Sequence, residues 1–142
     1  MSNAPANVAI ISAYFNPSVI DDMLVTTRKT LEQEKATLVV EVKVPGSFEI
    51  PLVAEKLLAR KDIDALVVLG YIEKGETLHG EIMGHIVYRS LIDAELRHQK
   101  PIGLGIIGPG ATLEQALARK ESCARNAARA ALRMIEVMKS GI

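Results

Sequence analysis

The sequence is poor in cysteine and in aromatic side chains, and it carries no excess of charge. Cys123 is the single cysteine among 142 residues, so no disulfide can form within the chain and no cluster of thiolates can bind a metal. The 17 basic and 17 acidic residues give a formal net charge of zero. Such a chain lacks the positive field that attracts phosphate backbones, so we do not expect nucleic acid as a partner.

Long hydrophobic runs are also missing. Apolar residues make up 49% of the chain, yet no uninterrupted run approaches the roughly 18 residues that a membrane helix needs. No basic segment followed by an apolar one opens the sequence, as a secretion signal would require. The length is typical of one domain. We therefore expect a single domain spanning residues 1–142, with no membrane partner and a cytoplasmic location.

What the sequence does contain is a regular alternation of segments rich in branched apolar residues with segments of helical length and period. The expected strands span residues 8–14, 37–44, 65–70 and 101–107, and the expected helices span 18–34, 48–60, 77–99 and 112–139. This alternation predicts a three-layer α/β/α sandwich with a four-stranded parallel sheet. In the flavodoxin-like strand order 2-1-3-4, a ligand binds at the carboxyl ends of strands one and three.

Residues 70–79 form the first candidate site, because an apolar strand ends there in a glycine turn before a helix. Free N–H groups at a helix start attract phosphate or carboxylate, and the Thr77 hydroxyl adds a donor. The same residues equally suit an ordinary helix cap. His79 is a candidate acid-base group, because histidine is the side chain most often used for proton transfer, although a lone histidine is more often structural. His85 lies about 240° around an ideal helix from His79, so we expect no metal site between them.

Two other turns reach the same expected edge of the sheet. Phe15 follows the first expected strand, where its ring either stacks on a flat ligand or plugs the end of the sheet. After the second expected strand, Gly46 and Ser47 offer backbone groups and Glu49 offers a carboxylate. This segment either binds a polyol or serves as a rigid connection between strand and helix.

Arg119 lies early in the last expected helix, after the turn at residues 108–110. Its guanidinium can bind a phosphate through two parallel hydrogen bonds. The residues alone do not favour Arg119 over Arg125 or Arg129, because most arginines are solvated or packed along their stems.

Taken together, these motifs resemble the lumazine synthases over nearly the whole chain. The resemblance rests on Phe15-Asn16, Pro-Gly-Ser-Phe-Glu-Ile-Pro at 45–51, Gly-Glu-Thr-Leu-His at 75–79, and Glu114-Gln115-Ala116 before Arg119. The turn at 108–110 resembles the archaeal-type branch of the family. The resemblance implies a transferase of riboflavin biosynthesis that needs neither a cofactor nor a metal. Such an enzyme condenses 5-amino-6-(D-ribitylamino)uracil with 3,4-dihydroxy-2-butanone 4-phosphate, giving 6,7-dimethyl-8-ribityllumazine, phosphate and water.

The resemblance also implies which residues hold the two small-molecule substrates. His79 is implied as the proton shuttle. The residues implied to bind the ribitylaminouracil are Phe15, Ser47, Phe48, Glu49, Tyr71, Ile72, Glu73 and Leu104. Those implied to bind the butanone phosphate are Glu76, Thr77 and Arg119.

Several positions depart from the commoner bacterial pattern. Leu104 stands where many members carry phenylalanine, Ala127 stands where a lysine is often found, and Gly80-Glu81 replaces an aromatic-aspartate pair. A second cation near the substrates is therefore expected only if Arg125 provides it.

Members of this family form pentamers with active sites between neighbouring subunits, and some build a hollow shell from twelve pentamers. Riboflavin synthase is a candidate partner. Two other functions remain open: an archaeal-type riboflavin synthase, which dismutates two lumazines, and a non-catalytic flavin-binding or shell-forming homologue. The segment 75–79 argues against the first. Retention of Phe15, Glu49, Thr77, His79 and Arg119 argues against the second.

Overall fold

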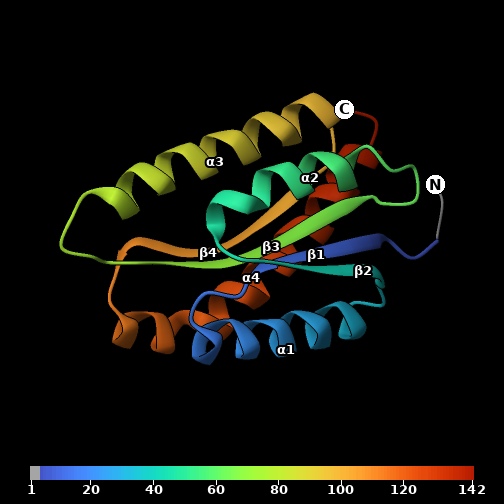
Figure 1. The fold of residues 1–142 in the computed structure, drawn as a ribbon. Coiled ribbons are helices and arrows are strands. Elements are labelled where there is room, and N and C mark those ends of the chain that lie inside the picture. The colour runs from blue at the N-terminus through green and yellow to red at the C-terminus, as the bar shows by residue number, and fades with distance from the viewer. Residues whose placement is uncertain (1–3) are drawn as a thin grey trace.

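The computed structural model describes residues 4–142, in which strands and helices alternate as expected (Figure 1). The strands are β1 (Asn7–Ala13), β2 (Thr37–Val44), β3 (Ala65–Glu73) and β4 (Ile102–Ala111). The α-helices are α1 (Pro17–Gln33), α2 (Ile50–Leu58), α3 (His79–His98) and α4 (Leu113–Lys139). Within this part of the chain the strands form one parallel sheet in the order β2-β1-β3-β4. The predicted strand order is therefore confirmed.

The sheet is covered on both faces because alternate residues of its central strands point in opposite directions. In β3, Val67 and Leu69 pack into one apolar cluster with α1 and α4. Leu66 and Val68 pack into a second cluster with α2 and α3. All four are fully buried, and Figure 1 shows the two pairs of helices on opposite faces of the sheet. The three-layer sandwich predicted from the sequence is confirmed.

The alanine-rich last helix lies against the sheet of its own chain. A Cβ atom on Gly103 of β4 would lie 2.1 Å from the backbone oxygen of Ala127. Glycine is therefore what allows α4 to approach β4 so closely. Ala127 itself is 5% exposed and belongs to the core on this face. Ala127, one of the positions that depart from the commoner bacterial pattern, is thus a packing position in this chain.

Strand β4 is longer than predicted, because residues 108–110 continue its pairing with β3 instead of breaking it. Glu73 pairs with Ala111 after a register shift between Tyr71 and Glu73. Gly108 and Gly110 have φ angles of 100° and 85°, which glycine adopts without steric penalty. These angles let the strand continue through an irregular segment.

Two helices begin later than predicted. A short 3-10 helix, Ser47–Glu49, precedes α2, which begins at Ile50 with Pro51 in its first turn. Proline suits that position because a first-turn N–H has no partner within the helix. Helix α3 begins at His79, and residues 74–78 form an irregular connection from β3. His79 is therefore the first residue of its helix.

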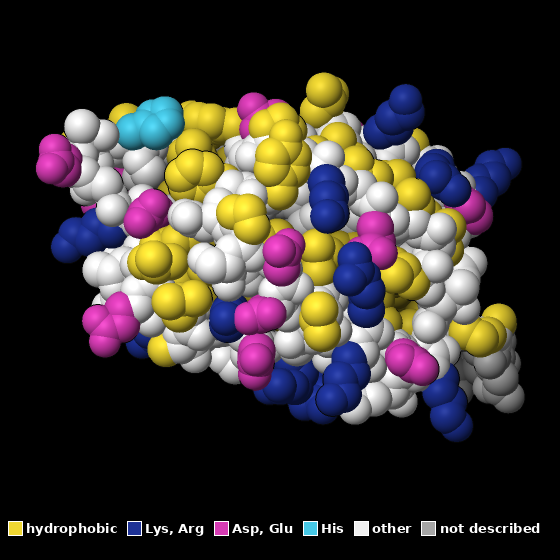
Figure 2. Space-filling view, turned by 60° about the horizontal axis from the view of Figure 1, so that its bottom comes forward, with side chains coloured by type: hydrophobic (Ala, Val, Ile, Leu, Met, Phe, Trp, Pro, Cys, Tyr) yellow, Lys and Arg dark blue, Asp and Glu magenta, His cyan; other side chains and the backbone are white. Residues whose placement is uncertain are grey.

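Charged side chains of both signs are mixed over the surface. On the face brought forward from the lower side of Figure 1, Figure 2 shows Lys and Arg side chains interspersed with Asp and Glu. Several form ion pairs, including Arg28 with Glu41 at 2.8 Å. Across residues 4–142, no helix combines the length and apolar character needed to span a bilayer.

Candidate active site

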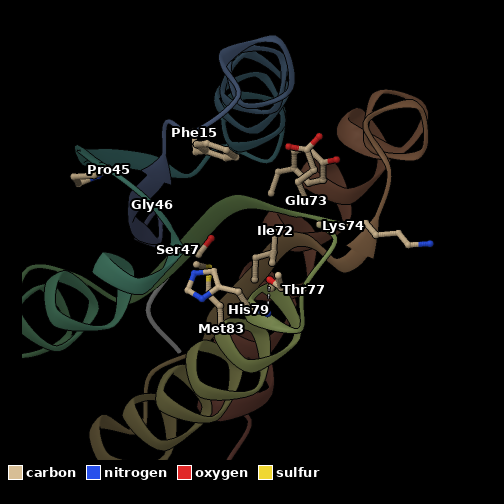
Figure 3. Close-up of a pocket in the computed structure, with 13 residues that line it drawn as sticks. Phe15, Pro45, Gly46, Ser47, Ile72, Glu73, Lys74, Thr77, His79 and Met83 are labelled. Atoms are coloured by element: carbon tan, nitrogen blue, oxygen red, sulfur yellow. Dashed lines mark hydrogen bonds between the residues drawn. The ribbon is translucent and has the colours of Figure 1, made fainter.

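A cavity of about 390 Å³ opens where β1, β2 and β3 end. This volume lies within the range of about 300–1,000 Å³ that is usual for small-molecule sites. Five segments supply its walls: the turns after β1 and β2, the end of β3, the connection to α3, and the first turns of α3 (Figure 3). The lining residues are Phe15, Pro45, Gly46, Ser47, Tyr71, Ile72, Glu73, Lys74, Gly75, Thr77, His79, Gly80 and Met83.

Phe15 forms one wall from the turn between β1 and α1. Its side chain is 55% exposed, so the ring is not packed into the end of the sheet. Asn16 beside it has a φ of 61°, a left-handed conformation in which asparagine is several-fold enriched. The Asn16 amide donates to Glu73 Oε2 at 3.4 Å. This contact ties the turn after β1 to the end of β3, and Phe15 lies across the cavity from His79 (Figure 3).

The segment after β2 places one hydroxyl inside the cavity and two larger side chains beside it. Ser47 is 3% exposed, and its hydroxyl points into the cavity (Figure 3). A Cβ atom on Gly70 would lie 3.0 Å from Ser47 Oγ, so this glycine leaves room for the hydroxyl. The Phe48 ring packs edge-on against His79 at 5.9 Å between centroids. A carboxylate oxygen of Glu49 lies 3.3 Å from where a Cβ on Gly46 would be.

At the end of β3, Tyr71 and Ile72 both line the cavity. Each is 3% exposed. The Tyr71 ring packs with the α1 and α4 cluster, and its hydroxyl donates to the backbone oxygen of Ala111 at 3.0 Å. Burial raises the pKa of Tyr71, and the charge of Glu73 adds to this effect. The Tyr71 hydroxyl therefore stays protonated at neutral pH and acts as a structural donor.

The start of α3 brings Thr77 and His79 to the cavity. Thr77 Oγ1 accepts a hydrogen bond from the His79 backbone N–H at 3.3 Å (dashed in Figure 3). Thr77 thus accepts from the first residue of the helix and also lines the cavity, whereas the N-cap position itself is Leu78. The His79 ring is exposed and lies near Phe48 and Met83. A side chain so placed can exchange protons with both a bound ligand and water.

Gly80 explains how α3 begins so close to the end of β3. A Cβ atom at this position would lie 3.2 Å from the Glu73 backbone oxygen and 3.3 Å from Cγ2 of Ile72. The glycine that replaces the aromatic residue of the commoner pattern therefore lets the first turn of α3 rest directly on the strand. Glu81, next to it, is exposed to solvent.

Five expected residues are not among the lining residues of this single chain: Phe48 and Glu49, which lie beside the cavity, and Arg119, Leu104 and Glu76. Arg119 is exposed, and its guanidinium donates to the Gln115 backbone oxygen at 3.2 Å. Leu104 is paired with Val68 in the middle of β4 and packs against the cluster of α2 and α3. Glu76 is exposed and is not a lining residue. Arg125, the candidate second cation, is half-buried and also lies outside the lining.

Sequence reasoning missed several lining residues, chiefly Lys74 and Met83. Met83 lies one helical turn after His79, and this i, i+4 spacing was the signal that could have found it. The Lys74 backbone N–H donates to the Ala111 oxygen at 2.8 Å, while its side chain points away from the other labelled residues in Figure 3. Within residues 4–142, no three His, Cys, Asp or Glu side chains are arranged to hold a metal ion.

Comparison with known proteins assigns the chain to a family. The family model described as 6,7-dimethyl-8-ribityllumazine synthase matches residues 5–139. A protein of that name from Metallosphaera sedula is 41% identical over 99% of this chain and 93% of its own length. One from Pyrobaculum arsenaticum is 39% identical over 94% of this chain and 89% of its own. One from Staphylothermus marinus is 49% identical over 69% of this chain and 65% of its own. This chain belongs to the 6,7-dimethyl-8-ribityllumazine synthase family.

Proposed function

We propose that this chain condenses 5-amino-6-(D-ribitylamino)uracil with 3,4-dihydroxy-2-butanone 4-phosphate to form 6,7-dimethyl-8-ribityllumazine. The observation that carries the proposal is the convergence of Phe15, Ser47 and His79 on one cavity at the carboxyl edge of the sheet. The family match over residues 5–139 supports it and favours the action of the whole chain as one catalytic domain. No step of this condensation calls for a metal or a redox cofactor.

The ribitylaminouracil is proposed to bind between Phe15 and the end of β3. Phe15 presents an exposed ring on which a pyrimidine can stack. The backbone of Tyr71 and Ile72 lies opposite, within the same cavity. Ser47 and Glu49 supply a hydroxyl and a carboxylate for the ribityl chain, and Phe48 closes the side next to His79. Glu73, held by Asn16, completes this wall.

The butanone phosphate is proposed to bind at the start of α3, next to Thr77. Backbone N–H groups at a helix start and the positive end of the helix dipole favour an anion there. The exposed carboxylate of Glu76 lies outside the lining, so Glu76 is proposed to act through its backbone. Arg119 and Leu104 lie off the cavity of their own chain. We propose that a neighbouring subunit supplies both to this site.

His79 is proposed to move the protons of the reaction. The amine of the uracil attacks the ketone and an imine forms with loss of water. Phosphate is then eliminated, and the ribitylamino nitrogen attacks the remaining carbonyl carbon, closing the second ring with loss of a second water. Each step transfers a proton, and histidine is the side chain most often used as a general acid and base. Binding both substrates side by side in one cavity supplies much of the remaining rate by orientation.

We also propose that the chain acts as a homo-oligomer, either a pentamer or a multiple of pentamers, for which riboflavin synthase is a candidate partner. Exposed apolar side chains on α3 support the proposal that another subunit covers this helix. Ile82, Ile86 and Leu96 are 54%, 50% and 62% exposed. Leu52 of the adjacent α2 is 80% exposed. Such a patch marks an interaction surface on a soluble protein. Light scattering after gel filtration separates a pentamer, a decamer and a shell of 60 subunits by mass.

One assay tests the reaction. Purified protein is mixed with both substrates, and lumazine absorbance and phosphate release are followed together. We expect both to rise at equal rates above the uncatalysed background. A parallel reaction receives the lumazine alone, and riboflavin formed there would identify the dismutating enzyme instead. Absence of any product in both reactions would identify a non-catalytic homologue.

A further inference from the structure

One side of α3 is held against the ends of β3 and β4 by three residues spaced one helical turn apart: Gly80, Gly84 and Tyr88. Gly80 rests on the backbone oxygen of Glu73, as described above. A Cβ atom on Gly84 would lie 2.7 Å from the ring carbons Cγ and Cδ of Pro109. The two glycines therefore let the helix backbone lie directly on the strand ends.

Tyr88 adds a directional contact to this packing. Its hydroxyl lies 2.6 Å from the Gly108 backbone oxygen and 3.1 Å from the Ile106 backbone oxygen. The side chain is half-buried, and burial raises the pKa of Tyr88 to about 12. The hydroxyl thus stays protonated at neutral pH, and its O–H donates a hydrogen bond that these two carbonyl oxygens share. A phenylalanine here would keep the ring and lose the donor.

The segment that Tyr88 holds is also fixed from its other end. The Tyr71 hydroxyl donates to the Ala111 oxygen at 3.0 Å, and the Lys74 backbone N–H donates to the same oxygen at 2.8 Å. Residues 106–111 therefore connect the middle of α3 to the end of β3, which forms the cavity wall. Helix α3 cannot shift along the sheet without breaking the two Tyr88 contacts.

We propose that Tyr88 is a positioning residue for the reaction, acting through His79. Its hydroxyl fixes α3 against the end of β4 and thereby fixes His79, the first residue of that helix, at the cavity wall. Tyr88 is not a lining residue, so it acts through the helix and not on the substrates. This inference rests on the proposed function, because it gives Tyr88 an effect on proton transfer by His79.

The size of the effect follows from the distances that proton transfer needs. A donor and an acceptor must lie about 2.6–3.2 Å apart. A misplacement of about 1 Å costs on the order of 100-fold in rate. Loss of one hydroxyl, with the ring still packed, should displace the helix by less than that. We therefore expect Tyr88→Phe to lower kcat about tenfold, and to change the KM for ribitylaminouracil less than about twofold.

A double-mutant cycle with His79 tests the proposal. If Tyr88 acts through His79, Tyr88→Phe should lower kcat about tenfold in the native background and less than about twofold in the His79→Ala background. Gly84→Ala forces α3 away from Pro109, so its loss of kcat should also depend on the presence of His79. This second variant tests the proposal if Tyr88→Phe does not fold. Equal losses in both backgrounds, or an unchanged kcat, would overturn the proposal.

A matched control removes a hydroxyl bond elsewhere in the fold. Thr27 of α1 is fully buried, and its hydroxyl donates to the Met23 oxygen at 2.8 Å. Thr27→Val should lower thermal stability while leaving kcat unchanged, because α1 packs on the opposite face of the sheet from α3. A native protein that makes no lumazine would refute the proposed function itself. Native turnover with a fully active Tyr88→Phe variant would refute only the role of Tyr88.

Discussion

The two edges of the sheet differ in the side chains that they expose. At the amino edge, Asp64 accepts from the Asn7 backbone N–H at 2.8 Å, and the Lys100 ammonium donates to the Leu58 and Arg60 oxygens at 2.9 and 2.8 Å. At the carboxyl edge, Phe15 and Phe48 are 55% and 41% exposed. Hydrogen bonds join neighbouring elements at both edges, but only the carboxyl edge also presents exposed aromatic rings beside a cavity. Substitutions at the two edges should therefore affect different properties.

The largest effect is expected from His79→Ala at the carboxyl edge. Loss of a general acid-base group lowers kcat by about 10²–10⁴-fold. Both KM values should change much less, since the walls that bind the substrates remain. Steady-state assays of lumazine formation give kcat and both KM values. His85→Ala is the matched control, because His85 is exposed on the same helix but does not line the cavity. Similar losses from both substitutions would contradict a proton-transfer role for His79.

The next effect is expected from Arg119→Gln, which should raise the KM for butanone phosphate about tenfold or more, because a charge-assisted bond to phosphate is lost. The KM for ribitylaminouracil should stay nearly constant. Arg133→Gln on the same helix is the control, since Arg133 pairs with Glu136 at 2.9 Å on the surface. If both KM values rise equally, Arg119 does not bind the phosphorylated substrate.

The fold was more predictable than the ends of its elements. The fully apolar run of β3 and the repeated alternation of strand and helix were enough to predict the layers, and the strand order was predicted as the commonest one for such an alternation. The end of β4 was not predicted, because Gly108 and Pro109 normally interrupt a strand. Pairing between Glu73 and Ala111 continues the strand there. That pairing depends on a neighbouring strand, which local sequence does not describe.

The site, like the fold, was predictable where chain topology decides the position of a residue and unpredictable where distant contacts decide it. Phe15, Ser47 and His79 each follow a strand, so the topology alone brings them to one edge. Arg119 was also expected there, but its place on α4 keeps it off the cavity of its own chain. A sequence motif does not state whether its residues meet within one chain. Tyr88 gave no signal at all, because no spacing rule predicts a hydrogen bond from a helix to the end of a strand.

At the amino edge, Glu55→Gln should reduce stability without changing turnover. The Glu55 carboxylate pairs with Arg97 and lies 2.6 Å from His98 Nε2, which joins α2 to α3. These groups are partly exposed, so the loss should be about 1 kcal/mol and the melting temperature should fall by about 2–4 °C. Scanning calorimetry with a parallel activity assay measures both. Glu136→Gln, which breaks a more exposed pair, should have less effect. A lower kcat in Glu55→Gln would contradict the division between the two edges.

The smallest effect is expected at Glu95 of α3, and it depends on pH. Burial raises the pKa of Glu95 above its ordinary value of 4.5, and a backbone hydrogen bond with Ile102 opposes the rise. The folded state thus binds the proton more tightly than the unfolded state does. The associated stability is fully present below pH 4.5 and is lost as the pH rises through the raised pKa. Glu95→Gln removes the buried charge, so it should raise the melting temperature at about pH 7 and lose that gain at about pH 4. A gain of the same size at both pH values would show that burial of the charge is not its cause.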